Sequence, residues 1–418
     1  MVDDIRPPAR NNLGDDKDKN LEPLKVQEPP QEVIDEATVD VAKEEEGFVV
    51  VPERGKRKPK NPFKALGCKI SSFSKKQKNI FLVIIILLIG ASGAGAYALL
   101  NKKEPVVVPV TPVVIEKKIE PPKPTTEASR LTGVQIPIEL NKRPVTSIQI
   151  ENSPDARPQS ALNQAGVVFE AIAEGGITRF NASFLEAQPD YIGPIRSVRP
   201  YYAQLVAPFD PIFVHAGGSG DGLAKLAELG LKDLDHGANG GAFQRVSDRY
   251  APHNLYSSMS ALDVASKSRG YLTSEVKSFV RKAEKPSTAP TAKSIDMVIS
   301  SALYNTHYDY DKDNNSYKRS MAGAPHVDHK SGTQIAPKVL VALVTPFNQN
   351  GIYSVYGVVG TGNGYIFQDG DVTAINWTKS SDKEQFKFTD SLGKEVGLNP
   401  GQTWFTLVKN APSVTFAP

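Results

Sequence analysis

The longest apolar segment of the chain runs from Ile80 to Leu100 and contains 21 residues without a charged side chain. A helix of that length measures about 32 Å, which matches the hydrocarbon core of a bilayer. Because backbone polar groups in lipid must be satisfied internally, this segment is predicted to be a transmembrane helix. Small residues four apart on one face, such as Gly90 and Ala94, would let two such helices pack closely as a homodimer.

Charged residues around this segment predict its orientation. Ten basic residues and no acidic residue lie between Arg54 and Asn79, whereas the far side begins with Lys102 and Lys103. Because cytoplasmic flanks carry the excess of lysine and arginine, the N-terminus is predicted to be cytoplasmic and everything after residue 100 extracytoplasmic. A cleaved signal peptide is disfavoured, since such peptides lie at the extreme N-terminus. The sequence thus predicts a single-pass protein of the cell membrane.

Two polar segments flank the predicted membrane helix. Residues 1–53 carry 15 acidic and 6 basic residues, so residues 1–79 are predicted to form a disordered cytoplasmic tail, acidic and then basic. Residues 101–130 contain six prolines and are expected to form a stiff spacer. At about 3.1 Å per residue this spacer could reach roughly 90 Å. The single cysteine, Cys68, lies in the tail, so no disulfide is expected beyond the membrane.

Residues 131–285 combine strand and helix patterns. Strands are predicted over residues 147–152, 166–174, 178–186 and 211–216, and helices over residues 199–209 and 221–230. Gly175 and Gly176 mark a hairpin turn between the second and third strands. Gly230 is the expected end of the second helix. This part is predicted to be a mixed α/β domain.

From about residue 295 the pattern changes to short strands separated by turn residues. These strands are predicted over residues 306–311, 316–321, 338–345, 352–359, 364–370, 372–378, 384–390 and 403–409. Residues 294–418 are therefore expected to form a β-rich domain, with the boundary in the charged, proline-containing stretch 281–293. The predicted fold class is α+β, with a mixed first half and a strand-dominated second half.

Several unusual strings occur together in this outer part. They include IGPIRSVRPYY (192–202), PIFVHAGGS (211–219), APHNLYSS (251–258) and YKRSMAGAPHVD (317–328). In this order they resemble the YerB-like family of bacterial envelope lipoproteins, a two-part domain of unknown function, and the likeness covers residues 131–418. The resemblance implies an outward-facing envelope protein and brings no established reaction. Where such relatives have a lipid anchor, this chain has the predicted membrane helix.

Polar side chains are densest in the first half of the outer part. The candidate ligand-binding residues are Arg157, Glu170, Arg179, Arg196 and Arg199. They fall at predicted strand ends and turns, where side chains can converge over a sheet edge. Arginine forks bind carboxylates and phosphates, so the group could hold an anionic cell-wall or envelope ligand. The alternative is that Glu170 and Glu174 pair with Arg179 and Arg196 as structural bridges.

His215, His253 and Glu174 are the candidates for proton transfer. His215 follows a predicted buried strand and precedes the glycine loop 217–220, which opens a helix. Such a loop can bind an anion at the helix terminus, and a plain tight turn is the alternative. Asp235 and His236 could join the two histidines, although their spacing matches no zinc pattern.

Other chemistry has weaker support. The acidic stretch 309–317 lacks the glycine and glutamate of a calcium loop and instead predicts a hairpin turn. PHVDH at residues 325–329 offers too few ligands on one face of a strand, so we predict no metal site and no cofactor. Residues 101–418 carry 33 basic and 31 acidic residues, so nucleic acid is not an expected partner.

Two functional hypotheses follow from these residues. In the first, the chain is a membrane-anchored, extracytoplasmic binding or scaffold protein of the bacterial cell envelope that holds an anionic ligand in an arginine-rich cleft. In the second, it is an envelope hydrolase or transferase in which His215 or His253 acts as base, a glutamate as acid, and arginines hold the substrate. The second hypothesis is favoured if one cleft is lined by Arg179, Arg196, Arg199, His215 and His253 and a carboxylate touches a histidine. If the arginines are instead locked in separate salt bridges away from any pocket, both site hypotheses fail and only an interaction surface remains.

Overall fold

The computed structural model describes residues 74–100 and 124–418, with side chains between residues 74 and 100 described in part. The chain divides into two units, Met1–Ile115 and Glu116–Pro418. The predicted cytoplasmic tail and most of the predicted spacer lie outside the described residues. Among the described residues, every strand belongs to the second unit.

Helix α1 (Lys75–Leu100) is the described element of the first unit. It covers the predicted apolar segment, so the helical part of that prediction is confirmed. Aliphatic side chains along it, such as Leu87 and Ile89, are about two-thirds exposed. Across the described parts of the chain, no helix has both the length and the apolar character needed to cross a membrane. The predicted membrane crossing at residues 80–100 therefore gains no support from the structure.

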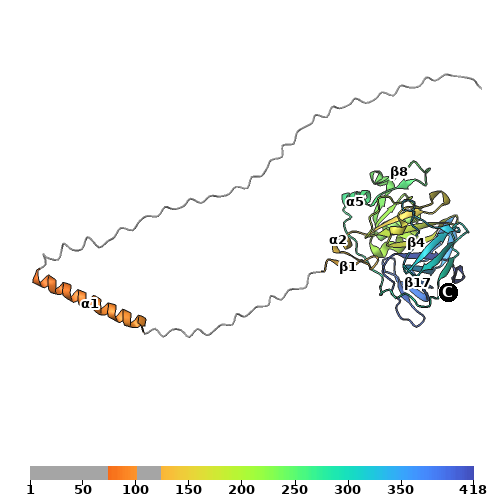
Figure 1. The fold of residues 1–418 in the computed structure, drawn as a ribbon. Coiled ribbons are helices and arrows are strands. Elements are labelled where there is room, and N and C mark those ends of the chain that lie inside the picture. Colours follow the sequence, from red (N-terminus) through yellow and green to blue (C-terminus); the bar gives the residue numbers. More distant parts are fainter. Residues whose placement is uncertain (1–73, 101–123) are drawn as a thin grey trace, which may run out of the picture. The chain divides into compact units, whose positions relative to one another are not determined.

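A long mixed sheet forms the centre of the second unit (Figure 1). In spatial order its strands are β19 (Lys387–Thr389), β18 (Asp371–Lys379), β17 (Gly360–Gln368), β14 (Val339–Val344), β20 (Thr403–Val408), β4 (Val167–Glu174), β5 (Ile177–Phe184), β3 (Thr146–Glu151), β6 (Ile212–His215) and β7 (Lys232–Asp235). A hairpin of β15 (Phe347–Asn350) and β16 (Tyr353–Tyr356) attaches to it where Tyr353 pairs with Glu174. Strand β20 pairs in parallel with both β14 and β4, so strands from both predicted halves share one sheet.

Two glycines form the turn between β4 and β5, at the end of the sheet where the candidate residues lie. Gly175 and Gly176 adopt φ angles of 56° and 81°, which favour glycine over residues with a Cβ. They bring β5 back antiparallel to β4, as predicted. Every residue of β3 is buried, because this strand is covered on both faces.

A second sheet contains most of the remaining strands of the β-rich half. Its order is β13 (Ala324–Pro325), β12 (Ser316–Met321), β11 (Thr306–Asp311), β10 (Ser294–Met297) and β21 (Val414–Ala417). Strands β11 and β12 form the hairpin predicted in place of a calcium loop. Hydrogen bonds from Asn314 and Lys318 lower the pKa of Asp311 to about 2, so this carboxylate stabilises the turn.

Short helices and two small sheets complete the unit. The helices are α2 (Ile138–Asn141), α3 (Pro200–Val206), α4 (Gly220–Leu229) and α5 (Met259–Ser268), and the small sheets are β1 (Thr126–Ala128) with β2 (Gln135–Pro137) and β8 (Gln244–Arg245) with β9 (Leu255–Tyr256). The predicted helices at 199–209 and 221–230 are confirmed as α3 and α4. Gly230 ends α4 in the left-handed conformation, with φ 62°.

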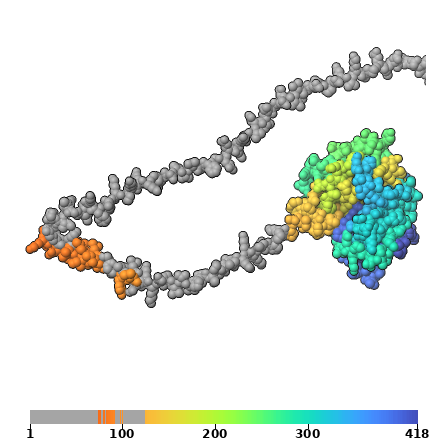
Figure 2. Space-filling model, viewed as in Figure 1, coloured from red at the N-terminus to blue at the C-terminus, as the bar shows by residue number. Residues whose placement is uncertain are grey.

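Aromatic packing connects the two halves of the unit. Phe169 of β4 stacks on Phe405 of β20 with ring centroids 4.7 Å apart, and Phe279 stacks on Phe405 at 5.3 Å. In Figure 2 the segments coloured yellow to green and those coloured cyan to blue form one continuous body. The predicted α+β class, with a strand-dominated second half, is confirmed. The division into domains 131–285 and 294–418 stays a prediction, because the sheet and core run through both.

Candidate functional site

The candidate residues gather around the ends of β3, β4 and β5. Glu151 lies directly opposite Arg179 in the antiparallel register, and Arg179 lies opposite Ala171. Because successive side chains of a strand point to opposite faces, Glu151 and Arg179 share one face of the sheet while Glu170 points to the other. The five predicted ligand-binding residues therefore do not form one group.

Glu174 pairs with two of the predicted arginines. Its two carboxylate oxygens accept hydrogen bonds from Arg179 and Arg199. Arg179 also donates to the Ser197 carbonyl at 3.1 Å, and the Arg199 guanidinium lies 5.1 Å from the centre of the Tyr353 ring. The side chains of Arg179 and Arg199 are 4% and 6% exposed. This arrangement matches the structural-bridge alternative for Arg179. The second arginine on Glu174 is Arg199, whereas the alternative named Arg196.

Glu170 belongs to a buried network between the two sheets. Arg319 of β12 and the indole N–H of Trp404 donate to its oxygens at 3.0 and 3.1 Å. Burial raises the pKa of Glu170, an effect that Arg319 opposes. The Arg319 Nε donates to His326 Nδ1 at 3.0 Å, and His326 Nε2 lies 2.9 Å from Gln159 Oε1. Glu170 and Arg319 are fully buried, so this network holds the sheets together and is closed to a ligand.

A different carboxylate, Glu151, brings an arginine and a histidine together. Its Oε1 atom lies 2.9 Å from His253 Nδ1 and 3.2 Å from Arg196 Nε, and Ser153 Oγ donates to the same oxygen at 2.9 Å. Asp155 lies 3.9 Å from the other ring nitrogen of His253. Glu151 itself is 4% exposed, whereas Arg196 and His253 are 26% and 21% exposed. We call Glu151, Ser153, Asp155, Arg196 and His253 the Glu151 site.

Arg196 differs from the other predicted arginines in its free terminal nitrogens. Within residues 124–418, neither terminal nitrogen of Arg196 has a hydrogen-bond partner. Arg157, by contrast, donates twice to Asn152 at 3.0 Å and stacks against Tyr304 at 5.0 Å. The Arg196 Nε lies 3.2 Å from Glu151 Oε1 in an ion pair without a hydrogen bond, so the terminal nitrogens of Arg196 are the ones available to a ligand.

His215 does not join this site. It is fully buried, its Nδ1 lies 2.8 Å from the Gly217 carbonyl, and its Nε2 lies 2.8 Å from Asp233. Asp235 approaches it at 3.5 Å, as expected, whereas His236 packs against Phe243 instead. Both ring nitrogens of His215 are therefore occupied, which leaves neither for proton transfer to a substrate.

The glycine loop before α4 is a structural turn. The Gly217 N–H donates to Asp235 Oδ1 at 2.8 Å, and the Ser219 hydroxyl caps the helix by accepting from the Gly222 N–H. A carboxylate of the protein thus occupies the position that a bound anion would take. The tight-turn alternative fits this geometry better than the anion site.

The PHVDH segment is also structural. Asp328 is 2% exposed and accepts from the Ala161 N–H at 2.6 Å, which ties it to the first half. His329 faces Asp248 at 3.8 Å. Among the residues that the structure describes, no three histidine, cysteine or acidic side chains are arranged to hold a metal ion.

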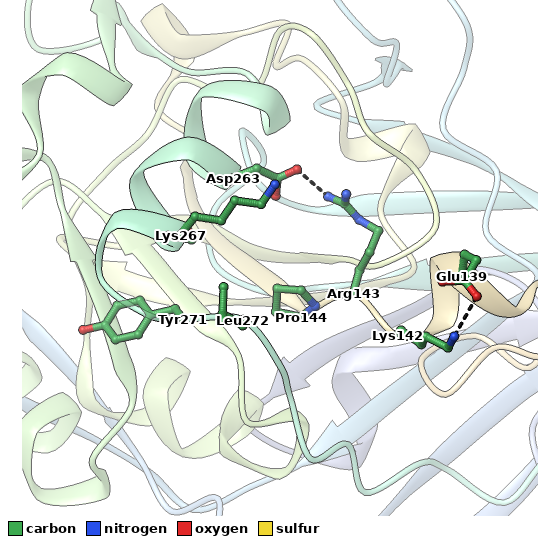
Figure 3. A pocket seen from close by; sticks show the side chains of 9 residues that line it. Glu139, Lys142, Arg143, Pro144, Asp263, Lys267, Tyr271 and Leu272 are labelled. Atoms are coloured by element: carbon green, nitrogen blue, oxygen red, sulfur yellow. Dashed lines mark hydrogen bonds and ion pairs between the residues drawn. The ribbon is translucent and has the colours of Figure 1, made fainter.

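A surface pocket lies between α2 and α5, apart from these residues (Figure 3). It has a volume of about 260 Å³. Two ion pairs line its wall, Lys142 with Glu139 at 2.6 Å and Arg143 with Asp263 at 2.7 Å. These pairs neutralise most of its charge, so it is a weaker candidate for an anionic ligand than the Glu151 site.

Sequence reasoning missed the residues that organise both polar groups. Glu151 and Ser153 lie at the end of a correctly predicted strand, in IENSPD, where a polar run after alternating apolar residues was the available signal. Arg319 lies in a predicted strand with alternating polar residues, and nothing local distinguishes it from a solvent-facing arginine. The polar groups around Glu151 and around Arg319 each depend on contacts between segments more than 100 residues apart.

Comparison with known proteins places this fold in a family. Residues 131–272 match the N-terminal domain, and residues 295–405 the C-terminal domain, of the family described as "Protein of unknown function (DUF3048)". A relative from Bacillus subtilis (strain 168), described as "Putative lipoprotein YerB", is 31% identical over 295 residues, covering 69% of this chain and 88% of that protein. The crystal structure of the YerB protein from Bacillus subtilis has 28% identity and a TM-score of 0.63, covering 69% of this chain and 99% of that chain. The chain therefore belongs to the DUF3048 family, in agreement with the YerB-like resemblance of its sequence.

Proposed function

We propose that this protein is an extracytoplasmic binding protein of the bacterial cell envelope that holds an anionic ligand at the Glu151 site. The observation that carries the proposal is the free, partly exposed guanidinium fork of Arg196, whose Nε lies 3.2 Å from the buried Glu151 carboxylate. An arginine fork binds a carboxylate or phosphate through two parallel hydrogen bonds. The name of the Bacillus subtilis relative, a lipoprotein, supports the envelope location.

Charge around the strand ends supports the same ligand class. Four arginines lie there, Arg157, Arg179, Arg196 and Arg199, against the carboxylates of Glu151, Asp155 and Glu174. Glu170 does not contribute, because Arg319 neutralises it. The resulting excess of positive charge would attract an anion toward Arg196.

A binding screen with the full chain in detergent tests this proposal. The probes are solubilised cell-wall fragments, separated into phosphate-bearing and carboxylate-bearing pools, and binding is measured by calorimetry. We expect Arg196→Gln to weaken binding at least tenfold, since a hydrogen bond to a charged group contributes about 1.5–3 kcal/mol. The affinity of the unmodified chain should also fall as salt is raised.

Arg269→Gln is the matched control, because Arg269 is an exposed arginine at the end of α5 that donates to Asn239 at 2.6 Å. It should bind the fragments as the unmodified chain does. Equal binding by Arg196→Gln and the unmodified chain, or no binding of either pool, would contradict the proposal.

The contact between Glu151 and His253 favours a second candidate function, an envelope hydrolase or transferase. A buried carboxylate that orients Nδ1 of a histidine leaves Nε2 to move a proton, while Arg196 would hold the substrate. In this case His253→Gln should retain fragment binding and abolish conversion of the bound fragment, as followed by mass spectrometry. If the unmodified chain also leaves the bound fragments unconverted, the enzyme hypothesis is contradicted and binding remains the proposed function. In this second proposal the partner carboxylate is Glu151 rather than Glu174, because Glu151 Oε1 lies 2.9 Å from His253 Nδ1.

We also propose that residues 80–100 anchor the chain in the cell membrane with the N-terminus inside. The support comes from the sequence, namely 21 uncharged residues preceded by ten basic ones. A homodimer through the small residues of this segment belongs to the same proposal.

Cysteine labelling in intact cells tests this topology, because Cys68 is the single cysteine of the chain. A membrane-impermeant maleimide should label Cys68 after permeabilisation and not before. The reverse pattern is expected for a chain that combines Cys68→Ser with Ser380→Cys, since Ser380 is exposed in the outer unit. Labelling of Cys68 in intact cells would show that the proposed orientation is wrong.

A further inference from the structure

A pocket without charged residues lies on the β17–β18 hairpin. Its wall includes Asn363, Tyr365, Ala374, Ile375, Asn376 and Ser391, and its volume is about 270 Å³. It shares no residue with the Glu151 site, so an inference about it does not depend on the proposed anion binding.

Strand register gathers the polar groups of this pocket on one face. Asn363 lies directly opposite Asn376, and Tyr365 lies opposite Ala374. Opposite residues, and residues two apart along a strand, share a face, so both amides and the tyrosine project to the same side. Gly364 lies between them, where a Cβ would come within 2.2 Å of the Ala342 carbonyl oxygen. This close approach of β17 to β14 gives the face a rigid support.

The polar side chains of the pocket are unengaged. Within residues 124–418, the side chains of Asn363, Tyr365, Asn376 and Ser391 make no hydrogen bond. Each of these groups can both donate and accept a hydrogen bond. The Tyr365 ring is held edge-to-face by Phe416 at 5.8 Å, which leaves its hydroxyl free.

Absence of charge limits the ligands that this pocket can take. No acidic, basic or histidine residue occurs from Thr345 to Gln368, a run of 24 residues. A charged ligand would find no counter-charge in the wall, and an apolar ligand would bury four polar groups without hydrogen-bond partners. A ligand whose surface alternates hydroxyl groups with C–H faces brings no unpaired charge into the pocket, and its hydroxyl groups can pair with the four polar side chains.

From this match we infer that the β17–β18 pocket binds a neutral saccharide. The two amides pair with neighbouring sugar hydroxyls, which donate and accept in the same way. The Tyr365 ring packs against the C–H face of the sugar ring, as aromatic side chains do with apolar surface. The pocket volume lies just below the range of about 300–1,000 Å³ that drug-sized sites have, so one or two sugar units fill the pocket.

Calorimetry with defined oligosaccharides tests this site. The full chain in detergent is titrated with tetramers of glucose and of N-acetylglucosamine as neutral probes, and with a galacturonate tetramer as the acidic probe. A neutral tetramer should bind, and the double variant Asn363→Ala, Asn376→Ala should weaken it at least tenfold. Asn350→Ala, an exposed amide on β15 outside the pocket, is the matched control and should bind normally.

Three results would overturn the inference. Failure of both neutral tetramers to bind, equal binding by the double variant, or stronger binding of the acidic tetramer each contradicts a neutral-saccharide site. Both substituted asparagines are exposed, so the variant should keep the thermal unfolding midpoint of the unmodified chain. Arg196 is unchanged in the double variant, so the variant should still bind anionic fragments if the proposed function is right. Loss of saccharide binding with retained anion binding therefore concerns only the β17–β18 pocket.

Discussion

Three glutamates on strands β3 and β4 have three different environments. Glu174 accepts from two guanidiniums and is 23% exposed, Glu170 is fully buried with Arg319, and Glu151 shares one oxygen among three side chains. Their partners decide what each can do. Glu170 and Glu174 satisfy arginines that hold the structure together, whereas Glu151 places Arg196 and His253 where a ligand can reach them.

The buried His326 gives a prediction at the scale of one residue. Burial first, and then the nearby Arg319 and Arg157, hold the pKa of His326 well below 6.5. The unfolded chain takes up a proton at this histidine below about pH 6.5 while the folded chain does not, so the free energy of unfolding falls as pH decreases. The loss approaches about 1.4 kcal/mol per pH unit until the folded pKa is reached.

Urea unfolding at pH 7.5, 6.5 and 5.5 measures this effect. His326→Gln keeps an acceptor for Arg319 and removes the titration, so the variant should be less sensitive to pH than the unmodified chain. The raised pKa of Glu170 acts in the opposite direction, since an acid whose pKa is raised in the folded state contributes stability that is lost as pH rises. That contribution is common to both proteins and cancels in their difference. Parallel pH profiles of the two proteins would show that His326 is not responsible.

At the scale of elements, alternation of apolar and polar residues predicted most strands and the two helices α3 and α4. The elements that were missed include strands β7, β10 and β21, helix α5, and the short elements β1, β2, α2, β8, β9, β13 and β15. Strand β7 has four residues, three of them charged, and β10 and β21 pair with each other from opposite ends of the second half. Local pattern therefore predicts the elements, while pairing between distant segments requires the structure. The same limit applies to the site, because Glu151 and His253 are 102 residues apart.

The whole second unit, Glu116–Pro418, is organised by the pairing of β20 with β4 and β14. Separate family models match its two halves, yet β4 of the first half has β20 of the second half as its parallel neighbour. Arg319 and Glu170 join the two sheets across the same divide, and Arg281 in the predicted boundary donates to the Leu131 and Asn399 carbonyls. Neither half can bury its core without the other.

This organisation predicts that the two halves unfold together. Residues 116–418 should lose tryptophan fluorescence and circular dichroism in a single urea transition, because the shared sheet makes unfolding cooperative. Residues 124–285 alone would expose the edge of β4 that β20 covers and the Phe169 face that Phe405 covers. Both tryptophans of the chain lie after residue 285, so circular dichroism is the readout for this fragment. We expect the fragment to show no cooperative transition and to gain one when residues 286–418 are added. A cooperative transition of the fragment by itself would show instead that the first half is an independent domain, with the interface to the second half formed after folding.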